Sequence, residues 1–65
     1  MDYQTPDQVH RLLRAAGGAS KLAYELGMSR QRVAYWQSKG RLPKLVVMAY
    51  GVVLDRIMAK QKLTA

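Results

Sequence analysis

The sequence predicts a mainly α-helical protein, a compact helix-turn-helix domain of four to five short helices. Apolar residues recur three and four positions apart through most of the chain, which is the period of a helix with one buried face. Glycine or proline stands at the ends of these segments, where helices start and stop. The 65 residues suffice for one domain, and 49% of them are apolar, enough for a core. Residues 1–65 are therefore expected to form a single domain.

A capping box in its Gln form, residues 5–8, opens the first predicted helix, with Pro6 at the first helical position. Gly17 and Gly18 stop this helix. The apolar stripe between these signals has the spacing of a single buried face and consists of Val9, Leu12, Leu13 and Ala16.

Two further helices follow at short intervals. The second is expected over about residues 19–26, and Gly27 after it supplies the left-handed conformation of a sharp turn. Ser29 can cap the third helix, which ends at Gly40. Val33 and Trp36 lie three positions apart on its buried side.

The last segment is predicted to be helical, with two readings open for part of it. In residues 45–58, 11 of 14 positions are apolar, and Pro43 suits a first helical turn. We expect a helix here, broken at Gly51. The alternative is a strand or hairpin over residues 45–54, giving an α+β fold, because four valines and Gly51 disfavour a helix. In either case residues 43–62 should complete the core and carry a dimer contact.

The charge of the chain indicates a polyanionic partner. Eleven Lys and Arg stand against four Asp and Glu, for a net charge of +7. Such a dense positive field on a small domain is typical of proteins that bind nucleic acid.

Several classes of site are disfavoured by composition. Without cysteine and with one histidine, the chain offers neither a disulfide nor a zinc site, so no metal or other cofactor is expected. The four carboxylates are scattered and provide no paired acid and base, so we do not expect an enzyme. No apolar run reaches the roughly 18 residues of a membrane span, and the expected location is the cytoplasm.

One window, about residues 19–38, holds the most informative pattern. Two helices that cross steeply through a short turn need a small residue, a glycine and a set of apolar residues at fixed spacing. The window supplies them as Leu22, Ala23, Leu26, Gly27, Val33 and Trp36. This pattern resembles the helix-turn-helix of bacterial and phage repressors, and the chain as a whole resembles small Cro-type phage repressors and their short antitoxin-like relatives.

The resemblance implies that the helix from about residue 30 to residue 37 lies in the major groove of DNA. Arg30 could then pair with guanine O6 and N7, and Gln31 with adenine N6 and N7. The full set of residues expected to contact bases is Ser29, Arg30, Gln31, Ala34 and Tyr35.

Phosphate contacts are expected on both flanks of that helix. The start of the preceding helix offers backbone amides and a lysine at Ala19, Ser20 and Lys21. From residue 28 to residue 44 the chain carries five cations and no acid. The phosphate-contacting residues expected there are Arg32, Ser38, Lys39, Arg41 and Lys44.

The apolar C-terminal segment exceeds what a small three-helix core can cover, which predicts an interface. We expect a two-fold dimer that places two reading helices about 34 Å apart on a palindromic site. The predicted dimer residues are Val47, Val53, Leu54 and Met58.

These expectations describe a dimeric transcriptional repressor that reads double-stranded DNA and needs no small-molecule ligand. The alternative is an antitoxin-type module whose C-terminal segment binds another protein and which also regulates its own gene through DNA.

Overall fold

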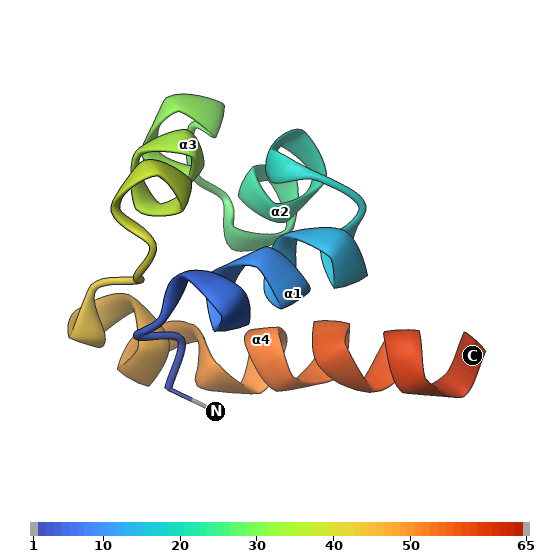
Figure 1. Cartoon of the computed structure of the whole chain (residues 1–65). Helices are drawn as coiled ribbons and strands as arrows, with labels where there is room; N and C mark the ends of the chain where they lie inside the picture. The colour runs from blue at the N-terminus through green and yellow to red at the C-terminus, as the bar shows by residue number, and fades with distance from the viewer. Residues whose placement is uncertain (1, 65) are drawn as a thin grey trace.

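The computed structural model describes the backbone of residues 2–64 and the side chains of residues 2–60. The described chain forms four helices and no strand: α1 (Pro6–Ala16), α2 (Ala19–Leu26), α3 (Arg30–Lys39) and α4 (Lys44–Thr64) (Figure 1). The mainly α-helical prediction is confirmed. The alternative strand or hairpin over residues 45–54 is not formed, since this stretch lies within α4.

The helix α1 is the centre of the fold because it packs against each of the other three helices. The pair α2 and α3 lies on one side of α1, and α4 runs along the other side (Figure 1). Within the described residues, the backbones of α3 and α4 do not approach each other closely. They are connected by a short linker, residues 40–43, and through the core that α1 organises.

The start of α1 follows the predicted capping sequence with one difference. The Thr5 hydroxyl accepts a hydrogen bond from the Gln8 backbone N–H at 3.2 Å, as expected. The Gln8 side chain, however, accepts from the backbone N–H of Gln4 at 3.0 Å, one residue before the cap. At the other end, Gly17 adopts a left-handed conformation (φ 93°), and its N–H donates to the Leu13 carbonyl at 3.0 Å. Both ends of α1 are thus satisfied locally.

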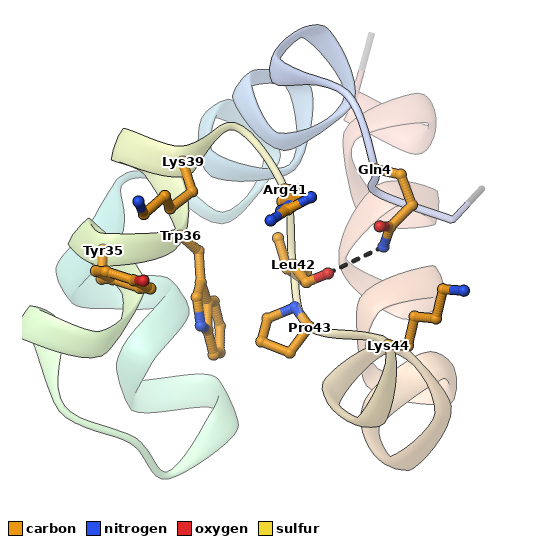
Figure 2. A pocket seen from close by; sticks show the side chains of 8 residues that line it. All are labelled: Gln4, Tyr35, Trp36, Lys39, Arg41, Leu42, Pro43 and Lys44. Carbon is orange, nitrogen blue, oxygen red and sulfur yellow. Dashed lines mark hydrogen bonds between the residues drawn. The ribbon is translucent and has the colours of Figure 1, made fainter.

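The N-terminal residues form a strap across the α3–α4 linker. The Leu42 N–H donates to the Tyr3 carbonyl at 2.9 Å, and the Gln4 side-chain amide donates to the Leu42 carbonyl, also at 2.9 Å (Figure 2). Tyr3 adopts a positive φ of 58°. These hydrogen bonds hold the linker in place between the end of α3 and the start of α4.

The core draws on every helix, the strap and the linker. Its buried residues are Tyr3, Val9, Leu12, Leu13, Leu22, Ala23, Leu26, Val33, Trp36, Leu42, Leu54 and Ile57. The Tyr3 hydroxyl is buried and has no hydrogen-bond partner among the described residues. Its burial, and secondarily the negative charge of Asp55, raise the pKa of Tyr3 above its ordinary value.

The long helix α4 is kinked at Tyr50 (φ −115°, ψ 17°), directly before the Gly51 at which a break was expected. One face of α4 enters the core through Leu54 and Ile57. The opposite face exposes Leu45 and Met48 to solvent. In the described part of the chain, no helix combines the length and the apolarity that a bilayer crossing requires.

Candidate nucleic-acid interface

The helix α3 is held to the protein along a narrow line. Of its ten residues, only Val33 and Trp36 are buried, and the other eight are exposed. The indole of Trp36 reaches from α3 toward Pro43 (Figure 2). A helix attached by two side chains presents nearly its whole circumference, which is the geometry required to enter a groove about 12 Å wide.

A tight turn orients α3 against α2. Gly27 ends α2 in the left-handed conformation (φ 67°), and the Met28 N–H donates to the Ala23 carbonyl at 2.9 Å. Ser29 then begins α3, because its hydroxyl accepts from the Arg32 backbone N–H at 3.2 Å. The buried Ala23 has a short side chain where α2 packs on α3. The two helices and the three-residue turn therefore form as the sequence predicted.

The five expected base-contacting residues occupy the start and the outer side of α3. All of them are exposed: Ser29, Arg30, Gln31, Ala34 and Tyr35. Ser29 differs from the rest because its hydroxyl is engaged in the helix cap. Arg30 and Gln31 stand in the first turn of α3, where a helix that enters a groove by its N-terminal end makes base contacts.

The expected phosphate contacts at α2 have a suitable backbone arrangement. The residue before α2 is Gly18, which supplies no side-chain cap, so the first amides of α2 are not covered by a capping side chain. Ser20 and Lys21 are exposed and Ala19 is half-buried. A helix start of this kind favours an anion through its free amides and its dipole.

The second group of expected phosphate contacts surrounds a hollow between the end of α3 and the start of α4, which we call the α3–α4 hollow (Figure 2). Its lining consists of Gln4, Tyr35, Trp36, Lys39, Arg41, Leu42, Pro43 and Lys44. Three of these residues are the cations that the sequence placed on the far flank, and the fold brings them together. The Lys39 ammonium also stands 5.5 Å from the centroid of the Tyr35 ring, within cation–π range.

The electrostatics of this side of the molecule are strongly positive. None of the cations Lys21, Arg30 and Arg32 or of those at the α3–α4 hollow forms an ion pair within the described residues. An ion pair is formed elsewhere, on α1, where the Arg11 side chain lies 3.3 Å from the Asp7 carboxylate. Cations that are not neutralised by an ion pair remain available to phosphate. The described residues hold no cluster of three or more possible metal ligands.

The structure separates the predicted phosphate contacts into two groups and adds one residue that sequence reasoning missed. Lys21 lies at the start of α2, whereas Lys39, Arg41 and Lys44 lie at the α3–α4 hollow. Arg32 and Ser38 are exposed on α3 outside both groups. Gln4 joins the hollow because the N-terminal strap crosses the linker there. No local pattern in the sequence signals that long-range contact.

The predicted dimer residues require a correction. Leu54 is completely enclosed in the core of the single chain, with 0% of its surface exposed, so it offers nothing to a second copy. Val47, Val53 and Met58 are half-buried and pack against the same core. Among the described residues, the large apolar side chains that α4 exposes are instead Leu45, Met48 and Val52. Leu54 was assigned to an interface because α4 is apolar on two opposite sides, and the sequence alone does not tell which of them enters the core.

Comparison with protein-family models, curated proteins and solved structures finds no match to this chain.

Proposed function

We propose that the protein binds double-stranded DNA in a sequence-specific manner, with α3 in the major groove, and acts as a transcriptional repressor. The observation that carries the proposal is the exposure of α3. Eight of its ten residues face solvent, while two buried side chains and a capped, tightly turned start fix its direction. The cations that flank this helix without acidic partners support the same reading.

Base recognition would fall chiefly to Arg30 and Gln31. An arginine fork matches guanine O6 and N7, and a glutamine amide matches adenine N6 and N7. The exposed methyl group of Ala34 suits the methyl group of thymine, and Tyr35 can reach a base edge or the neighbouring backbone.

Phosphate contacts would hold α3 in register from two sides. The start of α2 with Lys21 would meet one strand, and the α3–α4 hollow would meet the backbone beyond the other end of α3. Four to five neutralised phosphates per chain would give a slope of log K against log salt of about −4.

Repression would follow from occupancy alone, as two copies on a palindromic site block access by RNA polymerase. The monomer–dimer equilibrium would then make repression depend on protein concentration. Two copies related by a two-fold axis match half-sites about one helical turn apart.

The test is selection of bound sites from a random duplex pool at about 0.15 M salt, where non-specific binding is weak. We expect recovery of a palindrome with half-sites centred about 10 base pairs apart. Arg30→Ala should relax one base position in each half-site, and Arg11→Ala, an exposed arginine on α1, should leave the selected sequence unchanged. An unenriched pool would overturn the proposal. Equal weakening of all sequences by Arg30→Ala would make Arg30 a phosphate contact.

A second candidate function is that of an antitoxin-type module that binds another protein through α4. The exposed apolar side chains of Leu45, Met48 and Val52 favour it. Under this function the protein would form a stable complex with its partner, and DNA binding would serve to regulate its own gene. A soluble homodimer that uses the same side chains would count against it.

A further inference from the structure

The outer face of α4 carries an apolar stripe that nothing in the described chain covers. Leu45, Met48 and Val52 are 78%, 81% and 73% exposed. They follow one another at three and four positions, so they lie along one side of the helix. This side faces away from the one that buries Leu54 and Ile57, and α4 lies at the edge of the molecule with α1 on its inner side (Figure 1). A helix with two apolar faces normally has both covered.

We infer that a second copy of this chain covers the stripe, with the two α4 helices antiparallel about a two-fold axis near Met48. This inference deepens the proposed function, because it names the surface that would place two copies on a palindromic site. It moves the dimer contact from the half-buried and buried residues that the sequence suggested to the opposite side of α4.

The stripe is complementary to itself in this arrangement. In a two-fold pair each residue that touches another is touched by its counterpart in return. With the axis close to Met48, the two Met48 side chains meet at the centre, and Leu45 of one copy lies near Val52 of the other. By symmetry, Val52 of the first copy lies near Leu45 of the second on the other side of the axis. Flexible methionine side chains at the centre adapt well to such a contact.

Charge complementarity favours the antiparallel direction. Lys44 and Asp55 are both exposed and lie on opposite sides of the kink at Tyr50, Lys44 directly before Leu45 and Asp55 three residues after Val52. In the antiparallel pair, Asp55 of one copy lies beside Lys44 of the other, and the pair occurs twice. In a parallel two-fold arrangement the same residue of the two copies stands at the same height, so Asp55 of one copy would not lie beside Lys44 of the other. Charge pairs at the edge of an interface contribute mainly to orientation.

The size of the stripe predicts a weak dimer. Burying one such side chain removes roughly 100 Å² of apolar surface, so two copies would bury roughly 600 Å² of apolar surface. Because apolar atoms make up about 65% of a homodimer interface, the whole contact is roughly 900 Å². That area lies below the standard range of about 1,200–2,000 Å². We expect a dissociation constant on the order of 10–100 µM and tighter pairing when two half-sites on DNA hold both copies.

The first experiment is analytical ultracentrifugation of the whole chain without DNA, from about 1 to about 500 µM, a range that brackets the expected dissociation constant. The wild type should change from monomer to dimer within this range. Met48→Glu should remain monomeric, because two buried carboxylates would face each other at the axis. Tyr24→Glu is the matched control. Tyr24 is 85% exposed on α2, so its replacement should leave the dissociation constant within about twofold of wild type.

A wild-type chain that stays monomeric at about 500 µM would overturn the inference. So would a Met48→Glu variant that dimerises as the wild type does. Thermal unfolding of the Met48→Glu variant should match that of the wild type, since the side chain is exposed in the single chain. Loss of association with unchanged unfolding therefore reports on the interface and not on the fold.

The second experiment tests the orientation by exchanging charges. Lys44→Asp and Asp55→Lys should each weaken dimerisation by about three- to tenfold, because each creates two like-charge contacts. The double variant Lys44→Asp with Asp55→Lys should return to within about twofold of wild type. If the double variant is as weak as the two single effects combined, the antiparallel pairing is wrong.

Duplex binding separates this inference from the proposed function. If the wild type dimerises but selects no duplex sequence, the proposed function fails and the α4 contact stands. If Met48→Glu selects a single half-site where the wild type selects a palindrome, both stand. If Met48→Glu selects the same palindrome with the same affinity, the α4 contact is not the one used on DNA and the inference fails.

Discussion

The helices α3 and α4 differ in how each divides its residues between the core and solvent. α3 buries Val33 and Trp36 and exposes a surface that is mostly polar or charged. α4 buries Leu54 and Ile57 and exposes a second apolar face. Within the described residues the backbones of the two helices stay apart, and the outer residues of both are exposed. Each outer surface thus offers its own chemistry: hydrogen bonds and charge on α3, apolar area on α4.

The difference shows how far a helix can be stabilised independently of its outer surface. Two buried side chains and local caps hold α3 in place, so its outer residues are not needed for packing and are available to contact a ligand. For α4 the inner face alone provides the anchoring. If the two faces of each helix act independently, substitutions on the inner face should lower the free energy of unfolding, and substitutions on the outer face should leave it nearly unchanged.

The largest expected effect is on the anchor of α3. Trp36→Ala should destabilise the protein by about 3–5 kcal/mol, because it removes the larger of the two buried side chains that hold this helix and leaves a cavity. Urea unfolding followed by circular dichroism measures the change without depending on tryptophan fluorescence. Gln37→Ala, at the exposed neighbouring position, should change stability by no more than about 0.5 kcal/mol. Equal losses for the two variants would show that the outer face of α3 also packs.

The two faces of α4 should differ almost as strongly. Leu54→Ala should cost about 2–5 kcal/mol, since this leucine is fully enclosed. Leu45→Ala, the same change on the outer face, should cost less than about 0.5 kcal/mol in the monomer. Both are measured by urea unfolding at about 1 µM, well below the expected dimer range. A large loss for Leu45→Ala would mean that the outer face already packs within one chain.

These contrasts also explain which parts of the fold could be predicted from the sequence. The first three helices carry local signals at most of their ends: Thr5, Gly17, Gly27 and Ser29 act as the sequence suggested. Local signals of this kind are short-range and need no knowledge of the tertiary structure. The pattern of α4 does not separate a buried face from an exposed one, because apolar residues occur on several sides of its first turns. The sequence therefore allowed both strand and helix there, and it misassigned Leu54 to an interface.

The candidate site divides in the same way. The exposed positions of α3 follow from its narrow buried line, so Arg30 and Gln31 could be placed on the surface from spacing alone. That Gln4 joins Lys39 and Arg41 at the α3–α4 hollow depends on a contact between residues 38 positions apart. Periodicity carries no information about such a contact.

A smaller effect is expected at the start of α3. Ser29→Ala should cost about 1 kcal/mol, because the hydroxyl that accepts from the Arg32 N–H is lost. Ser38→Ala serves as the control, since this serine is exposed within α3 and caps nothing among the described residues; its effect should stay within about 0.5 kcal/mol. Chemical unfolding of the two variants compares them directly. If both lose the same stability, the cap does not hold the first turn on which Arg30 and Gln31 stand.

The smallest expected effect is a gain in stability at the buried end of the N-terminal strap. Tyr3→Phe should stabilise the protein by up to about 1 kcal/mol at neutral pH, because it removes a buried hydroxyl that has no partner among the described residues. The ring itself remains in the core. A loss of stability in this variant would show that the hydroxyl is satisfied in solution, for example by water.

The same substitution has a defined pH dependence. Burial, and then Asp55, raise the pKa of Tyr3, so the folded state holds the phenolic proton more tightly than the unfolded state does. This contribution to stability is fully present below the ordinary value of 10.0 and is lost as pH rises from there through the folded-state pKa. The advantage of Tyr3→Phe over wild type should therefore be constant from pH 7 to about 9 and widen above about 10. Urea unfolding of both proteins at several pH values tests this, and a constant difference across the whole range would mean that Tyr3 titrates equally in both states.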